Sequence, residues 1–302
     1  MVEKPSNLGG HKSGFVAIVG KPNVGKSTLL NAMLGRKLAI VTPKPQTTRK
    51  RILGVKSLPD AQLLLVDTPG LHESPSLVNR RMVERARTEM RSADVVLWLV
   101  DATEGEAGVD PSVARDLQGL RVPVCVALNK IDLVKKPSLL PLMAKVGGLL
   151  PGAEVVPVSA LRGENLDTLL RVLVGLLPEG PALYGDEEWT DQTERELAAE
   201  IVREKVILET RQEVPYSVAV TVEGFEEKPE KNLVVIRATV HVEKKSQKPI
   251  LLGEKGARIK KIGQAAREEL ERELGRRVYL ELFVKVSEGW TSDPRKLAEL
   301  GL

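Results

Sequence analysis

Gly20-Lys21-Pro22-Asn23-Val24-Gly25-Lys26-Ser27 is the stretch that decides the fold of the first half of the chain. It fits the pattern G-x-x-x-x-G-K-[ST] of a phosphate-binding loop. The apolar run Phe15–Val19 precedes the loop and predicts a buried strand, and Thr28–Leu34 follows it and predicts a helix. Because the N–H groups of such a loop and of the helix N-terminus form an anion site, we expect a nucleotide polyphosphate there. A chance glycine turn is the alternative, and the flanking strand and helix weigh against it.

The residues of this loop are expected to divide phosphate and metal binding between them. Lys26 would contact the β- and γ-phosphates, and the hydroxyl of Ser27 would bind Mg²⁺. The other nucleotide-binding residues predicted in this stretch are Gly20, Asn23, Val24, Gly25 and Thr28.

The composition favours a protein of two domains without a membrane span. The 302 residues are 42% hydrophobic and 28% charged, as in globular proteins. We see no apolar stretch of about 18 residues, and the polar start of the chain lacks the apolar core of a signal peptide. A single cysteine, Cys125, sits in an apolar run and excludes an internal disulfide, which favours the reducing cytoplasm. The net charge of +4 mildly favours anionic partners.

Apolar runs alternate with helical patterns over residues 14–180, after a polar tail at 1–13. This alternation predicts an α/β domain with a mostly parallel sheet and helices on both faces. The expected strands are Phe15–Val19, Arg51–Val55, Gln62–Val66, Asp94–Val100, Val124–Leu128 and Val155–Val158. The expected helices after the first are Val78–Arg91, Pro111–Gly119, Ser138–Leu149 and Leu166–Leu176.

A turn-rich polar run at 181–192 predicts a linker, and the pattern changes beyond it. Residues 193–302 predict a smaller α+β domain of order α-β-β-α-α-β with a C-terminal tail. Its expected elements are Thr193–Glu209, Tyr216–Val222, Leu233–Val240, Pro249–Leu252, Ala257–Leu274 and Val278–Val286, with Glu226–Asn232 connecting the first two strands.

The motif Asp67-Thr68-Pro69-Gly70 comes directly after a predicted strand. Asp67 would orient Mg²⁺ through water, and the N–H of Gly70 would contact the γ-phosphate. Between this motif and the phosphate loop lies a polar segment that contains Thr47 and Thr48. Either threonine could supply a further hard oxygen ligand to Mg²⁺ when the γ-phosphate is present, and we favour Thr48.

The motif Asn129-Lys130-Ile131-Asp132 predicts that the base is guanine. A carboxylate such as Asp132 accepts two hydrogen bonds from the N1–H and amino groups of guanine, and adenine offers no such pair of donors. Asn129 would brace the loop, and the stem of Lys130 would cover one face of the base. A backbone N–H of Ser159-Ala160, at the end of the next strand, could bind the guanine oxygen. A solvated turn is the alternative to this interpretation of N-K-x-D.

The second domain places Gly253-Glu254-Lys255-Gly256 between two predicted helices. KH modules use such a G-x-x-G loop to clamp the backbone of single-stranded nucleotides. Lysine and arginine cluster around it and would contact phosphates, and apolar side chains would form the floor of the groove. The basic residues predicted to bind RNA are Lys244, Lys248, Lys255, Arg258, Lys260 and Lys261. The expected floor residues are Ile250, Leu252, Ile259 and Ile262. Glu254 is an acid inside the loop, and an ordinary helix-turn-helix with a solvated basic face is the alternative.

The motifs over Gly14–Pro178 resemble the translation-factor-related GTPases and, among them, most of all the Era family of bacterial GTPases. The following α-β-β-α-α-β order resembles a type II KH domain, and Ser287–Trp290 also resembles Era, so the resemblance covers nearly the whole chain. It implies GTP hydrolysis to GDP with Mg²⁺, binding of the 3′ end of small-subunit (16S) rRNA, and assistance in 30S subunit assembly. It also implies a cytoplasmic protein with peripheral membrane association, and we expect a monomer.

The resemblance also assigns catalytic roles. Relatives with Asn at the position of Asn23 use it to hold K⁺ near the β- and γ-phosphates. Together with the phosphate- and metal-binding residues named above, this makes the predicted catalytic residues Lys26, Thr48, Gly70 and Asn23. Leu71 stands where Ras-like members have a Gln that orients water, which implies slow intrinsic hydrolysis. Two other interpretations stay open: a binding protein whose nucleotide cycle is vestigial, and a GTPase whose second domain binds protein.

Overall fold

A computed structural model describes residues 10–44, 47–70, 77–210 and 214–300. The chain divides into two compact units. Unit 1 comprises Met1–Ala39, Lys50–His72 and Met82–Asp191, and unit 2 comprises Ile40–Arg49, Glu73–Arg81 and Gln192–Leu302. Within the described ranges no helix combines the length and apolarity that crossing a bilayer requires.

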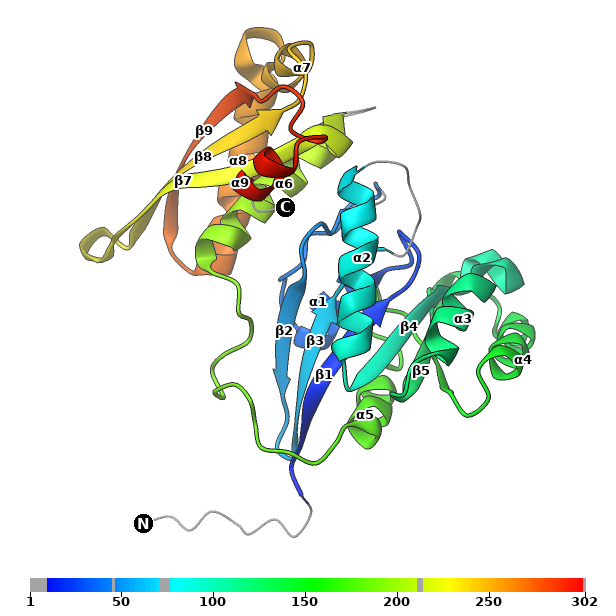
Figure 1. Cartoon of the computed structure of the whole chain (residues 1–302). Coiled ribbons are helices and arrows are strands. Elements are labelled where there is room, and N and C mark those ends of the chain that lie inside the picture. Colours follow the sequence, from blue (N-terminus) through cyan, green and yellow to red (C-terminus); the bar gives the residue numbers. More distant parts are fainter. Residues whose placement is uncertain (1–9, 45–46, 71–76, 211–213, 301–302) are drawn as a thin grey trace, which may run out of the picture. The chain divides into compact units, whose positions relative to one another are not determined.

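The described part of unit 1 is built on a six-stranded sheet of order β2-β3-β1-β4-β5-β6 (Figure 1). All neighbours pair in parallel except β2 and β3, which are antiparallel. The strands are β1 (Lys12–Val19), β2 (Ile52–Ser57), β3 (Ala61–Asp67), β4 (Val95–Asp101), β5 (Val124–Asn129) and β6 (Glu154–Pro157). The predicted mostly parallel sheet is therefore confirmed.

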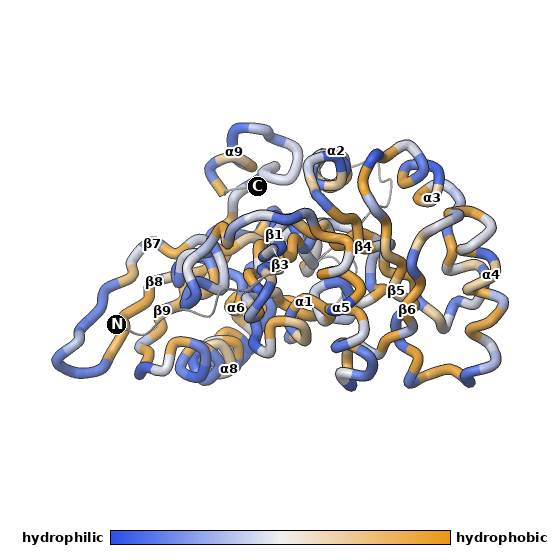
Figure 2. Tube along the Cα trace, turned by 90° about the horizontal axis from the view of Figure 1, so that it is seen from below, coloured by the Kyte–Doolittle hydropathy of each residue, from blue (hydrophilic) through white to orange (hydrophobic). Residues whose placement is uncertain are grey.

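Helices cover both faces of this sheet because its strands are apolar on both sides. Helices α1 (Lys26–Leu34) and α5 (Leu166–Leu176) pack on one face, against residues such as Ile18 and Leu97. The other face carries α2 (Leu77–Ser92), α3 (Pro111–Gln118) and α4 (Leu139–Leu149), packed around Trp98. Figure 2 shows β4 and β5 as the hydrophobic strands that this double cover requires. Cys125 is buried on the face that α1 and α5 cover, and burial raises the pKa of its thiol to about 12, which does not favour a reactive thiolate.

Unit 2 contains a three-stranded sheet of order β7-β8-β9 in its described part. Strands β7 (Val218–Lys228) and β8 (Leu233–Val242) are antiparallel, and β9 (Arg277–Val286) runs parallel to β8. Helices α6 (Glu194–Glu209) and α8 (Ala257–Leu274) pack side by side through apolar faces, and α7 (Gln247–Leu252) precedes α8 (Figure 1). This is the predicted α-β-β-α-α-β order, so the KH-type α+β fold is confirmed.

Several local features differ from the sequence prediction, and the following concern the ends of strands and added helical segments. Strand β7 continues to Lys228, because Glu226 and Glu227 pair with β8 although they are charged. The connection is therefore the short segment that follows, η5 (Pro229–Lys231). A further helix, α9 (Pro294–Glu299), follows β9, and its Leu297 packs with Trp290 and Ala219. The 3₁₀ segment η1 (Ala102–Gly108), which follows β4, was not predicted either.

Candidate functional site

The phosphate loop joins β1 to α1 with a backbone that its glycines make possible. Gly25 has φ of 100°, and a Cβ there would lie 2.4 Å from Nδ2 of Asn129. Gly20 has φ of 151°, and a Cβ there would lie 2.5 Å from the carbonyl oxygen of Leu99. Asn23 also has a positive φ, of 63°, and its side chain is exposed. Both glycines that the motif specifies are therefore required by close packing inside unit 1.

Lys26 lies buried inside this loop, with 7% of its surface exposed. Its ammonium donates hydrogen bonds to the carbonyls of Gly20 at 3.1 Å and Lys21 at 2.9 Å. Burial lowers the pKa of Lys26 to about 8, while the negative charge of Asp67 acts in the opposite direction. The loop therefore holds a desolvated cation where the motif predicts the β- and γ-phosphates.

The residues predicted to bind Mg²⁺ in unit 1 lie next to each other. Ser27 Oγ donates to Oδ2 of Asp67 at 2.7 Å, and Asp67 has no exposed surface. A hydroxyl and a carboxylate oxygen at this separation are hard ligands of the kind that Mg²⁺ prefers, so the pair fits the ion. Gly70 lies against the phosphate loop, since a Cβ there would be 3.0 Å from the backbone nitrogen of Pro22.

Asn129 connects the phosphate loop to the two base-binding motifs. Its Nδ2 donates to the carbonyl of Val24 at 2.8 Å, and its Oδ1 accepts from the N–H of Ala160 at 2.9 Å. The side chain is almost fully buried. Asn129 thus bonds to both neighbouring loops, as the expected brace would. Of the two N–H groups in Ser159-Ala160 that we expected could bind guanine, that of Ala160 is bonded to Asn129.

The carboxylate of Asp132 is oriented on both sides. Oδ1 accepts from Ser159 Oγ at 2.6 Å, and Oδ2 lies 3.5 Å from Nε of Arg162. The Asp132 side chain is 4% exposed, whereas that of Arg162 is 67% exposed. Arg162 was not predicted as a site residue, although it follows Ser159-Ala160 closely in sequence.

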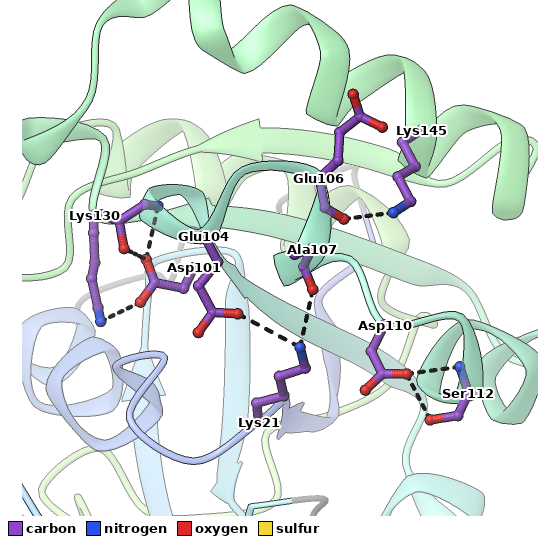
Figure 3. A network of polar contacts seen from close by, with 10 residues as sticks. Lys21, Asp101, Glu104, Glu106, Ala107, Asp110, Ser112, Lys130 and Lys145 are labelled. Carbon is purple, nitrogen blue, oxygen red and sulfur yellow. Dashed lines mark hydrogen bonds and ion pairs between the residues drawn. The ribbon is translucent and has the colours of Figure 1, made fainter.

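Lys130 has an ionic partner that the sequence analysis also missed. Its backbone adopts φ of 67°, and its ammonium pairs with Oδ2 of Asp101 at the end of β4 (Figure 3). Asp101 is paired in register with Asn129 on the neighbouring strand. Open α/β sheets bind ligands at the carboxyl ends of their strands, and Asp101 lies at such an end, as the residues of the other motifs do.

The G-x-x-G loop of unit 2 has the backbone that its glycines allow. Gly253 has φ of 69°, and a Cβ there would lie 2.8 Å from the Cβ of Arg258. Gly256 has φ of 80° and forms the N-cap of α8. Lys255 adopts φ of 47°, which is uncommon for a residue with a side chain. The loop thus projects Glu254 and Lys255, both exposed, between α7 and α8.

The remaining residues predicted to bind RNA lie around this loop with different partners. Arg258 donates through Nη1 to the carbonyl of Ile250, and Lys261 Nζ lies 2.9 Å from Oε1 of Glu209. Ile259 is half-buried. Ile262, which we expected on the groove floor, is fully buried, and its role there stays a prediction. The exposed lysines of the predicted set are Lys244, Lys248, Lys255, Lys260 and Lys261.

The segment that carries Thr48 belongs to unit 2, where helix α6 holds it. Arg203 Nη2 donates to the carbonyl of Thr47 at 2.6 Å, and Glu204 Oε1 accepts from the N–H of Val41 at 2.9 Å. Thr48 itself is 7% exposed. Its role as a metal ligand stays a prediction, and Leu71 lies outside the described residues.

Arg49 completes the attachment of this segment. Its Nη1 donates to the carbonyl of Val218 at 2.6 Å, and its guanidinium lies 5.7 Å from the ring centre of Trp290. Burial, and then the charge of Arg203, lower the pKa of Arg49 to about 9, with Glu200 opposing, so the group keeps its charge at pH 7. In the described part of Ile40–Arg49, hydrogen bonds at Val41, Thr47 and Arg49 thus attach the segment to the rest of unit 2.

Comparison with known proteins finds similarity over nearly the whole chain. Residues 15–130 match the family described as "50S ribosome-binding GTPase", and residues 213–291 match the KH domain family. The chain is 49% identical to GTPase Era of Syntrophus aciditrophicus, covering 96% of this chain and 95% of that protein. It is also 49% identical to GTPase Era of Geotalea daltonii, covering 96% and 97%.

Two solved structures are similar in fold as well as in sequence. An Aquifex aeolicus Era variant bound to GDP·AlF₄⁻ has a TM-score of 0.91 at 45% identity, covering 96% of this chain and 99% of that one. Era in complex with MgGDPNP and nucleotides 1506–1542 of 16S ribosomal RNA has a TM-score of 0.92, with the same identity and coverage.

The lowered pKa of Lys26 predicts that nucleotide affinity falls as the pH rises above about 8. A bound polyphosphate favours the charged amine and raises its pKa, so binding takes up a proton once the unliganded lysine is neutral. Affinity for GDP should therefore fall up to about tenfold per pH unit above 8. Calorimetry in two buffers of different ionisation enthalpy measures both affinity and proton uptake. Lys26→Ala is the control, and an equally steep profile in that variant would remove the assignment.

The base site predicts a change of specificity for Asp132→Asn. The asparagine amide accepts one bond and donates another, which suits the second carbonyl of xanthine and leaves the amino group of guanine without its acceptor. We expect the affinity for GTP to fall at least about tenfold and that for xanthosine triphosphate to rise. Competition binding of the two nucleotides measures the ratio. An unchanged preference for GTP would mean that Asp132 does not contact the base.

Proposed function

The chain belongs to the GTPase Era family, and we propose that it is a GTP-hydrolysing switch whose second domain binds RNA. The observation that supports the proposal best is the common position of its motifs at one edge of the unit 1 sheet. The phosphate loop, Asp67 and Asn129 come at the carboxyl ends of β1, β3 and β5, where open α/β sheets bind ligands. Asn129 joins the phosphate loop to the base loops by two hydrogen bonds.

In the proposed reaction, each residue stabilises charge or orientation rather than forming covalent bonds. Lys26 neutralises charge on the β- and γ-phosphates, and Ser27 and Asp67 hold Mg²⁺, which supplies positive charge at the phosphate oxygens when bound.

Three further residues act near the γ-phosphate in this proposal. Gly70 directs its N–H to the γ-phosphate, Thr48 adds a metal ligand in the GTP form, and Asn23 holds K⁺. The position of Gly70 against Pro22 of the phosphate loop supports its role.

We propose that the RNA partner is the 3′ end of small-subunit rRNA and that the protein assists 30S assembly in the cytoplasm. The solved Era complex with nucleotides 1506–1542 of 16S ribosomal RNA supports this choice. The exposed Lys255 and the positive φ angles of Gly253, Lys255 and Gly256 support a clamp on a phosphate chain. Monomeric state and peripheral membrane association stay predictions.

We also propose that nucleotide state and RNA binding are coupled through Ile40–Arg49. The domain boundaries proposed from the sequence put this segment in the GTPase domain at 14–180, whereas its contacts put it in unit 2 with the KH domain of 193–302. Thr48 is flanked by Thr47 and Arg49, which Arg203 and Val218 hold by hydrogen bonds. Turning Thr48 to a metal ion would compete with these contacts, so GTP would weaken them and GDP would not.

The clamp predicts that replacing both Glu254 and Lys255 by Asp weakens RNA binding about tenfold or more, because phosphate attraction becomes repulsion. Filter binding of a single-stranded 3′-end oligonucleotide at fixed salt measures the loss. Lys231→Asp, in the exposed connection η5 of the same unit, changes the net charge equally and is the control. If the double variant binds as the wild type does, the second domain uses another surface or binds protein.

The coupling predicts that Arg203→Met raises the affinity for a GTP analogue relative to GDP about threefold to tenfold. The variant keeps the apolar stem of the side chain but removes the hydrogen bond to Thr47 that opposes the GTP form. Competition binding of the two nucleotides measures the ratio.

Arg195→Met is the matched control for this prediction. It removes an exposed arginine of the same helix and should leave the ratio of the two affinities unchanged. A GDP affinity of Arg203→Met equal to that of the wild type would exclude misfolding of the variant. An unchanged ratio in Arg203→Met would then exclude the coupling.

A further inference from the structure

The segment η1 contacts lysines from both nucleotide motifs of unit 1 (Figure 3). At its start, Asp101 forms an ion pair with the ammonium of Lys130. The Asp101 side chain is 8% exposed and that of Lys130 is 30% exposed. Because the carboxylate is buried and the lysine reaches it from a more exposed position, the aspartate fixes where the lysine lies.

The two carboxylate oxygens of Asp101 have separate partners. Oδ1 accepts from the N–H of Thr103 at 2.9 Å and from its hydroxyl at 2.6 Å, which makes Asp101 the N-cap of η1. Oδ2 is thereby directed to Lys130. The carboxylate is oriented before it meets the lysine, so it does not depend on Lys130 for its own rotamer.

The far end of η1 is anchored as well, which keeps Asp101 in place. Lys21 of the phosphate loop donates to the carbonyl of Ala107 at 3.1 Å, and Lys145 of α4 donates to that of Glu106 at 2.5 Å. Lys21 also lies 3.6 Å from Oε2 of Glu104. Side chains from the phosphate loop and from α4 therefore hold the segment that Asp101 caps.

We propose that Asp101 is a positioning residue for the guanine base, acting through Lys130. Lysine has a flexible four-carbon stem, and ordering it on binding would cost conformational entropy. The ion pair with Asp101 orders the stem in advance, so that the base packs on a surface already formed. The inference rests on the proposed function, since it concerns GDP and GTP bound at that same site.

The test is a double-mutant cycle in the full-length chain, measured as the dissociation rate of fluorescent GDP. Asp101→Asn keeps an oxygen for the Thr103 cap but removes the charge, and Lys130→Met keeps the apolar stem but removes the ammonium. We expect Asp101→Asn to raise the dissociation rate about fivefold to tenfold in the wild-type background and less than about twofold in the Lys130→Met background.

Asp110 provides a matched control in the same chain. It caps α3 with the same geometry, its Oδ1 accepting from the N–H of Ser112 at 2.9 Å and from its hydroxyl at 2.7 Å. Asp110→Asn should leave the dissociation rate within about twofold of the wild type, because it removes an equal charge from a cap on another helix.

Each outcome decides a different claim. An equal effect of Asp101→Asn in both backgrounds, or no effect in either, would overturn the positioning role while leaving the GTPase proposal standing. Absence of GDP binding by the wild-type protein would overturn the proposed function and this inference with it. An effect confined to the background that has Lys130 would establish the role, since a merely structural loss would persist without the ammonium.

Discussion

The side-chain amide of Asn129 is the constraint on which the nucleotide site depends. Asn129 is 2% exposed, and its amide joins the carbonyl of Val24 to the N–H of Ala160, so three loops distant in sequence are held by one group. Leaving either backbone group buried without a partner would cost about 1–3 kcal/mol. The same amide forbids a side chain at Gly25, since a Cβ would lie 2.4 Å from its nitrogen. Packing against Asn129 of the base motif therefore requires glycine at position 25, in addition to any requirement from a bound phosphate.

Most of the fold could be predicted because buried parallel strands are continuous apolar runs and each is followed by a helical pattern. Helices α5 and α8 begin and end at the predicted residues. The nucleotide motifs could be located in the same way, because each follows directly after one of these apolar strands. Two features could not be predicted this way. Strand β2 was expected as a strand, but its antiparallel direction was not, because its apolar run resembles those of its parallel neighbours. The charged end of β7 pairs through its backbone, which its side chains do not reveal.

The parts of the site that were missed have no motif of their own. Asp101 pairs with Lys130, and Arg162 pairs with Asp132. In each pair the two residues are distant in sequence and are brought together by the fold. The assignment of Ile40–Arg49 to unit 2 was missed for a related reason. Its attachment uses backbone carbonyls and the buried charge of Arg49, and neither a hydrophobic pattern nor a charge count marks such contacts in advance.

The two lysines of the site show how one fold treats the same side chain differently according to its task. Lys26 is desolvated and donates to carbonyl oxygens in the field of Asp67, so its charge is costly in the unliganded protein and is stabilised most by a polyphosphate. Lys130 is expected to offer its apolar stem to the base, and its charge can therefore be satisfied inside the protein, by Asp101. A carboxylate as close to Lys26 as Asp101 is to Lys130 would compete with phosphate. The phosphates need the charge of Lys26, which therefore donates to neutral carbonyls in the protein. The base needs the stem of Lys130, whose charge can therefore be paired with a carboxylate.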